Sequence, residues 1–176
     1  MKKVIIKILV GLGIFLFSIL GILFFLSPQK TTPFKDQSGK VLANSIAEIR
    51  TVPINDYPQR LLIRGKDKNN PILLHVHGGP GAPDYPFFGS ANLEDIFTVC
   101  YWEQRGAGAS FSKAIPANSM NLHNMVEDGI TVTKFLKDHF KKEKIYLQGH
   151  SWGTAVGINM AHRRPDLYHA YIGIGQ

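Results

Sequence analysis

The sequence predicts an α/β fold with a mostly parallel sheet, because short apolar segments of strand length alternate with a segment of helical periodicity. Segments 72–76, 97–102 and 145–147 are short and apolar, as buried central strands are. Between the second and the third, apolar residues recur at helical spacing from Leu122 to Leu136. Helices packed on a parallel sheet are therefore expected.

The elements around this core are shorter and follow turn residues. Asn118 or Ser119 is expected to cap the central helix. Small residues after position 151 predict a second helix, which ends before Pro165. The remaining strands are expected at 44–54, 60–64 and 171–174, the first two separated by a turn at 55–58.

Composition excludes several classes of protein. Aromatic residues make up 11% of the 176 residues, too many for a disordered chain. Cys100 is the single cysteine, which excludes a disulfide framework and a zinc site built on several thiolates. We expect no metal and no organic cofactor.

The N-terminus predicts a membrane anchor. Lys2, Lys3 and Lys7 precede an uncharged run of 19 residues, 8–26. About 20 apolar residues cross a bilayer, whereas the core of a cleavable signal peptide has about 7–15 and ends at a small-x-small site. Ser27-Pro28-Gln29-Lys30 offers no such site.

We therefore expect an anchor at 1–27, a polar linker at 28–43 and a folded α/β domain at 44–176. The basic flank before the run favours a single-pass protein of the cell membrane, with its N-terminus in the cytoplasm and the domain outside.

The net charge of +7 does not indicate a nucleic-acid partner. Outside the anchor it falls to +4, and the densest basic cluster is typical of a solvated helix end. No aromatic residues or nucleic-acid motif accompany the cluster, which comprises Lys137, Lys141, Lys142 and Lys144.

The pattern G-x-S-x-G spans Gly149–Gly153, directly after an apolar strand and before a helical stretch. A serine hydroxyl is a weak nucleophile until a base removes its proton, and a sharp strand-to-helix turn pushes it toward that base. Gly149 and Gly153 let neighbouring backbone pass close to the turn. We predict Ser151 as a nucleophile; a simple turn is the alternative.

A second segment, His77-Gly78-Gly79-Pro80-Gly81, follows the first central strand. Acyl transfer develops negative charge on an oxygen, which two backbone N–H groups can stabilise. We expect one from Trp152 and the other from Gly79. His77 is expected to fix the loop by hydrogen bonding, and His75 to pack or pair in its strand. A plain glycine turn is the alternative; a P-loop is excluded because no Gly-Lys-Ser/Thr follows.

The third segment, Trp102-Glu103-Gln104-Arg105-Gly106-Ala107-Gly108-Ala109-Ser110, follows the second central strand. Glu103 and Arg105 are expected to form a structural ion pair beside the site, and the alternative is that they hold the charged end of a substrate. All three segments stand at the carboxyl ends of predicted parallel strands, where α/β sheets place their sites.

Together the three segments resemble the α/β-hydrolase superfamily and, within it, the prolyl iminopeptidase branch. That branch shows H-G-G-P-G, then D-Q-R-G-x-G-x-S, then G-G/H-S-W-G; the match covers residues 44–176, with Glu103 in place of Asp. The resemblance implies a serine hydrolase of aminopeptidase type, which cleaves a small peptide, amide or ester and can release an N-terminal proline. It also implies Ser151 as nucleophile and Gly79 and Trp152 as oxyanion donors, supported by His77, Gly78, Glu103, Gln104, Arg105, Gly149 and Gly153.

The superfamily places its triad acid and histidine after the nucleophile, following later strands and a helical cap. Here 25 residues follow Ser151. Asp166, His162 and His169 flank the turn after the next helix, whereas the base must reach within ~3 Å of the serine hydroxyl. We expect neither the triad acid nor the triad histidine in this chain.

Two hypotheses follow. The chain is the N-terminal part of a membrane-anchored serine hydrolase, truncated by a frameshift, a stop codon or an incomplete sequence, and inactive alone. Alternatively, it is a non-catalytic, membrane-anchored interaction module that uses the hydrolase scaffold. Retention of Ser151 and both glycine-rich turns favours the first. The nucleotide sequence beyond codon 176 distinguishes them.

Overall fold

A computed structural model describes residues 10–19, 31–85 and 92–176. The chain divides into two units, Met1–Lys30 and Thr31–Gln176. Residues 10–19 are helical, and the rest of the predicted transmembrane segment 8–26 lies outside the described residues. Within the described ranges, no helix is both long enough and apolar enough to cross a membrane.

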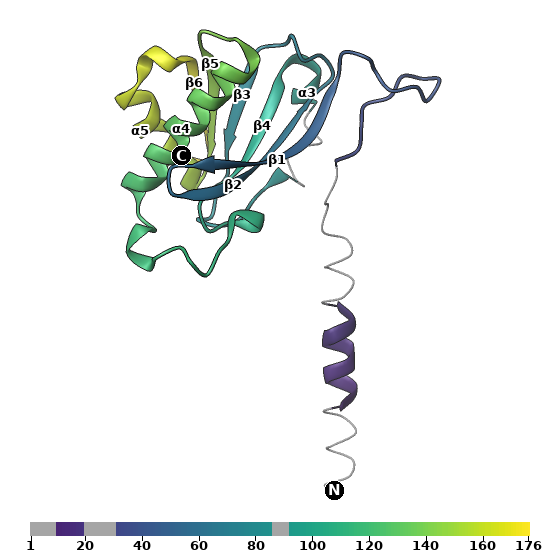
Figure 1. Cartoon of the computed structure of the whole chain (residues 1–176), viewed down its shortest axis with the longest axis vertical. Helices are drawn as coiled ribbons and strands as arrows, with labels where there is room; N and C mark the ends of the chain where they lie inside the picture. The colour runs from purple at the N-terminus through teal and green to yellow at the C-terminus, as the bar shows by residue number, and fades with distance from the viewer. Residues whose placement is uncertain (1–9, 20–30, 86–91) are drawn as a thin grey trace, which may run out of the picture. The chain divides into compact units, whose positions relative to one another are not determined.

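The second unit is built on one six-stranded sheet with the order β1-β2-β4-β3-β5-β6 (Figure 1). The neighbours β3 and β4, β3 and β5, and β5 and β6 are parallel, whereas β1 pairs with β2 and β2 with β4 antiparallel. The expected α/β fold with a mostly parallel sheet is confirmed. The strands are β1 (Ile46–Ile54), β2 (Tyr57–Gly65), β3 (Ile72–Val76), β4 (Thr98–Glu103), β5 (Ile145–His150) and β6 (Tyr168–Ile174).

The hairpin of β1 and β2 is tighter than the sequence indicates. The two strands pair without interruption from Ile46 opposite Gly65 to Ile54 opposite Tyr57. Only two residues remain for the turn, and the first, Asn55, has φ 50°. Asparagine visits the left-handed region more readily than most residues, which suits this turn.

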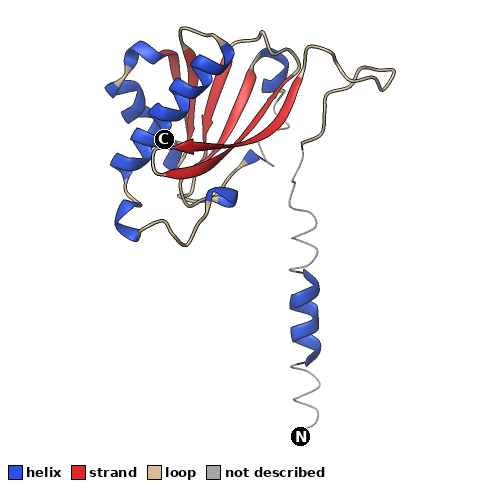
Figure 2. Ribbon diagram, viewed as in Figure 1, coloured by secondary structure: helices blue, strands red, loops and turns tan. Residues whose placement is uncertain are grey.

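Helices cover the two faces of the sheet unequally (Figure 2). On one face α4 (Leu122–Phe140) and α5 (Trp152–Arg163) bury apolar side chains such as Val126 and Met160 in the main core. On the other, the short α3 (Leu93–Ile96) packs Leu93 against a smaller cluster that contains Leu73 and Tyr101. The main core therefore lies between the sheet and the helix pair α4 and α5.

The predicted cap of the central helix is wrong. Asn121 is the N-cap of α4, and its side-chain Oδ1 accepts the N–H of Asn124 at 3.0 Å. The expected caps, Asn118 and Ser119, instead lie in a short 3₁₀ turn, η2 (Ala117–Ser119). Three asparagines or serines precede the apolar periodicity, and only the last is adjacent to the helix.

Part of the predicted linker packs against the sheet. The Arg64 guanidinium lies 4.5 Å from the centroid of the Phe34 ring, and Arg64 Nη1 donates to the Thr32 carbonyl at 2.7 Å. Lys35 and Val41 form an isolated antiparallel bridge. Residues from Thr31 onward thus belong to the folded unit.

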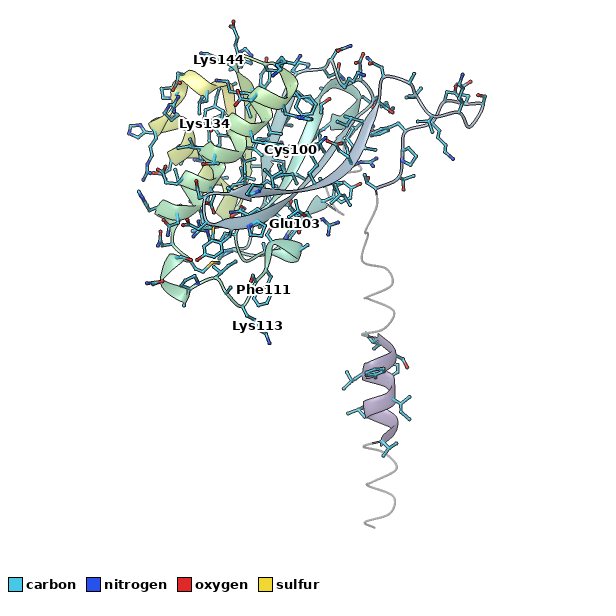
Figure 3. All side chains as sticks on the ribbon, in the orientation of Figure 1. Cys100, Glu103, Phe111, Lys113, Lys134 and Lys144 are labelled. Atoms are coloured by element: carbon cyan, nitrogen blue, oxygen red, sulfur yellow. The ribbon has the colours of Figure 1, made fainter. Side chains whose placement is uncertain are left out.

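Lys144, the last residue of the basic cluster, lies at the end of the domain away from the carboxyl end of β4 (Figure 3). Figure 3 shows Lys144 at one end and Glu103 and Phe111 toward the other. Lys141 has φ 55° and closes α4, its N–H donating to the Lys137 carbonyl. These lysines therefore mark a helix end, as expected.

Candidate active site

The three sequence segments meet at the carboxyl ends of β3, β4 and β5. Gln104 joins them: its Nε2 donates to the His77 carbonyl at 2.8 Å, and its Oε1 accepts the indole N–H of Trp152 at 3.2 Å. One buried side chain thus contacts both the glycine-rich loop after β3 and the turn after β5.

Ser151 forms a strained turn between β5 and α5. Its φ of 50° and ψ of −117° are unusual for a residue with a side chain, at a cost of about 1–3 kcal/mol. Two backbone hydrogen bonds hold the turn: Ser151 N–H donates to the Ile174 carbonyl at 2.8 Å, and the Ser151 carbonyl accepts the N–H of Thr154 at 2.8 Å. The Ser151 N–H is therefore occupied. Trp152 is the first residue of α5, where a backbone N–H has no acceptor within the helix.

Glycines allow the strand and the helix to approach this turn. A Cβ at Gly153 would lie 2.0 Å from the Val76 carbonyl oxygen, and one at Gly149 would lie 2.4 Å from the Gly153 oxygen. Real side chains do not reach such distances. Both glycines of the G-x-S-x-G pattern are thus required by packing around Ser151.

The glycine-rich loop packs directly on the serine turn. A Cβ at Gly78 would lie 3.2 Å from the Ser151 Cβ, and Gly79 has φ 116°. The loop and the turn line an open hollow of about 250 Å³. Its lining residues are Gly78, Gly79, Ala82, Pro83, Asp84, His150 and Ser151.

His77 fixes the loop, as expected. The Gln104 backbone N–H donates to its Nε2 at 3.1 Å, so the ring proton is on Nδ1, which donates to the Gly78 carbonyl at 2.8 Å. Burial lowers the pKa of His77 and keeps the ring neutral. Because both ring nitrogens are used by backbone groups, His77 is not placed to act as a base.

The expected ion pair of Glu103 with Arg105 is wrong. Arg105 pairs with Asp128 of α4 through two bonds of 2.8 Å, Nε to Oδ2 and Nη2 to Oδ1, and this raises the pKa of Arg105. Arg105 is only 4% exposed, so it does not present a charge to a substrate. Glu103 lies 3.8 Å from Arg60 and accepts the N–H of Ala109 at 2.6 Å. The sequence does not identify Asp128 as the partner of Arg105, because the surrounding pattern indicates a helix but not what its side chains contact.

The three candidates for a triad acid or base after Ser151, which are Asp166, His162 and His169, lie away from it. Asp166 is bound by Arg164 at 2.6 and 2.8 Å in the turn η3 (Pro165–Leu167) that follows α5. The 12 residues of α5 separate this turn from Ser151, a length of ~18 Å. His169 stands near the start of β6, beside the Tyr146 ring at 5.2 Å, whereas Ser151 follows the end of the parallel strand β5. His162 is in the last turn of α5. None of the three is placed as a base.

One polar group beside Ser151 was missed. Asp84 Oδ1 lies 2.8 Å from His75 Nε2, and Asp84 Oδ2 lies 2.9 Å from His150 Nδ1. The other ring nitrogen of His75 lies 2.8 Å from the side-chain oxygen of Gln148. The only sequence signal was the histidine inside G-x-S-x-G, and nothing in the sequence connected it with Asp84.

A sharp serine turn, a glycine-rich loop beside it and a mostly parallel sheet define an α/β hydrolase. Residues 71–176 match the family described as alpha/beta hydrolase fold, and the chain belongs to that family. The probable aminopeptidase YbaC of Bacillus subtilis (strain 168) is 45% identical over 134 residues, 75% of this chain and 42% of that protein.

Two further proteins share the resemblance. A putative proline iminopeptidase of Mycoplasma pneumoniae is 34% identical over 95 residues, 53% of this chain and 29% of that protein. The crystal structure of a proline iminopeptidase-related protein from Thermus thermophilus has a TM-score of 0.62 at 26% identity, covering 73% of this chain and 44% of that one. The resemblance to the proline iminopeptidase branch is confirmed, and the chain spans less than half the length of each of these proteins.

Proposed function

We propose that this chain carries the nucleophile and the oxyanion-binding loop of a serine hydrolase of aminopeptidase type, acting on a small peptide, amide or ester, with N-terminal proline release as its foremost reaction. The observation that carries the proposal is the strained Ser151 turn packed against Gly78 and Gly79. The names of the relatives supply the substrate class.

In this mechanism the Ser151 hydroxyl oxygen attacks the substrate carbonyl carbon while a general base takes the hydroxyl proton. The carbonyl oxygen gains negative charge, which the N–H groups of Gly79 and Trp152 stabilise. The tetrahedral intermediate then expels the leaving amine or alcohol, which receives the proton from the base. Water hydrolyses the resulting ester on Ser151.

The base and its orienting acid are supplied by polypeptide beyond these 176 residues. The chain covers 42% of the Bacillus subtilis relative, and none of the histidines after Ser151 is placed as a base. Without a base, the serine hydroxyl is a poor nucleophile. The isolated chain is therefore inactive in this proposal.

Labelling with a fluorophosphonate tests this assignment. We expect no labelling of the 176-residue chain alone, but labelling at Ser151 when the chain is extended by the part of the Bacillus subtilis relative that follows the matching region. The extended Ser151→Ala variant is the control and should remain unlabelled. Failure of the folded, extended protein to label, or stoichiometric labelling of the chain alone, would contradict the proposal.

We also propose that residues 8–26 anchor the chain in the cell membrane with residues 31–176 outside. Support comes from the uncharged run and its three preceding lysines. In bacterial membranes the chain should resist carbonate extraction, and protease added to intact spheroplasts should digest the domain.

A double substitution, Ile14→Lys with Phe17→Lys, should release the protein, since each charge costs about 2.5–3.5 kcal/mol at a membrane centre. Gln29→Lys with Gln37→Lys adds the same charge outside the run and should leave the protein in the membrane. Extraction of the unmodified chain by carbonate would disprove the anchor.

A further inference from the structure

Asp84 is a buried carboxylate that connects two separate parts of the candidate site. Its side chain is 10% exposed, and its two oxygens contact two different histidines. His75 belongs to β3, which leads into the glycine-rich loop, and His150 is the last residue of β5, directly before Ser151. The bridge therefore joins β3 to β5, the two strands that lead into the glycine-rich loop and the serine turn.

Because Asp84 follows the glycine-rich loop in the chain, its two hydrogen bonds restrain the end of that loop. The segment from Gly78 to Asp84 leaves β3, passes Ser151 and is bound back to β3 through His75. Its second bond, to His150, joins the end of this segment to the serine turn. The glycine-rich loop is thus held at both ends, by His77 at its start and by Asp84 at its end.

Asp84 carries a negative charge in this setting. Burial favours the neutral acid, but hydrogen bonds from His75 and His150 and the electrostatic interaction with His75 outweigh it and lower the pKa of Asp84. An ionised carboxylate only accepts hydrogen bonds, so His150 Nδ1 must be the donor. Bonds to a charged acceptor are stronger than neutral ones.

We propose that Asp84 is a positioning residue: its carboxylate fixes the glycine-rich loop against the serine turn, so that the Gly79 N–H faces the oxygen that becomes charged when Ser151 attacks. The inference rests on the proposed function for its catalytic meaning. The bridge itself is a property of the 176-residue chain and can be tested without turnover.

The test uses nitrogen-15 NMR of the full 176-residue chain in detergent micelles, comparing the unmodified protein with Asp84→Asn. In the unmodified chain at pH 8, His150 should carry its ring proton on Nδ1, and the amides of Gly79, Gly81 and Ala82 should show order parameters near 0.85, the value of rigid backbone. In Asp84→Asn the His150 ring signals should shift, and the loop order parameters should fall below about 0.6.

Asp166→Asn is the matched control, because it also removes a carboxylate from an ion pair, at an exposed turn remote from Ser151. It should change neither the His150 ring signals nor the loop. A general loss of stability would lower order parameters in β2 and β4 as well, which a positioning role does not predict.

The proposal is overturned if His150 carries its proton on Nε2 in the unmodified chain, if the loop stays rigid in Asp84→Asn, or if order is lost throughout the domain. Absence of fluorophosphonate labelling in the extended protein would instead refute the proposed function and leave these NMR results unchanged. The two failures are therefore distinguishable.

Discussion

Replacing Gly153 by alanine should destabilise the domain by about 3 kcal/mol or more, since overpacking of this kind has a large cost. The new Cβ would lie 2.0 Å from the Val76 carbonyl oxygen and 2.8 Å from the His77 carbonyl oxygen. Both are backbone atoms of the central strand and its loop, so neither can move without shifting the sheet. Urea unfolding of the purified chain, followed by circular dichroism, measures the loss.

Gly157→Ala in the same helix is the control. Its Cβ would meet a side-chain atom, Tyr171 Cε2, at 2.7 Å, and the half-buried tyrosine ring can move. Alanine also favours a helix over glycine by about 1 kcal/mol, which offsets the contact. The change should stay within about 1 kcal/mol. Equal stability of the two variants would contradict the close approach of α5 to β3.

Asp128→Asn should lower the free energy of unfolding by about 3–5 kcal/mol, the usual penalty for removing one partner of a buried ion pair. Asp128 is fully buried and accepts from Asn55 at 2.6 Å and Gln59 at 2.7 Å in addition to Arg105. The amide retains the shape of the carboxylate but leaves the Arg105 charge uncompensated and presents an N–H₂ group to donors. Urea unfolding measures the difference.

Asp166→Asn provides the comparison. Asp166 is paired with Arg164 by two bonds as short as those of Asp128, but the pair is exposed to solvent. Solvent and salt weaken such a pair, so little stability should be lost. If both variants lose the same free energy of unfolding, burial does not explain how the ion pair of Asp128 with Arg105 stabilises the domain.

The sequence predicted the features that depend on neighbouring residues. Apolar runs predicted β3, β4 and β5, and turn motifs predicted which loops hold Ser151 and the glycine-rich segment. These signals are local because strand burial and tight turns are specified by a few consecutive residues.

The features that the sequence did not predict join distant residues. Arg105 was assigned to Glu103, two positions away, whereas its partner Asp128 is 23 positions away in another element. Asp84 and His150 are 66 positions apart. Such pairs depend on which strands are neighbours in the sheet, and one sequence carries no record of that order.

The route of the chain explains why the hollow lies between β3 and β5. The chain leaves β3 over the face that carries α3, and it leaves β5 over the opposite face, which carries α5. Where connections from two adjacent parallel strands diverge to opposite faces, a crevice opens at their carboxyl ends. The location of the site is thus a consequence of topology, and substitutions in the lining residues can change what binds there without changing where it binds.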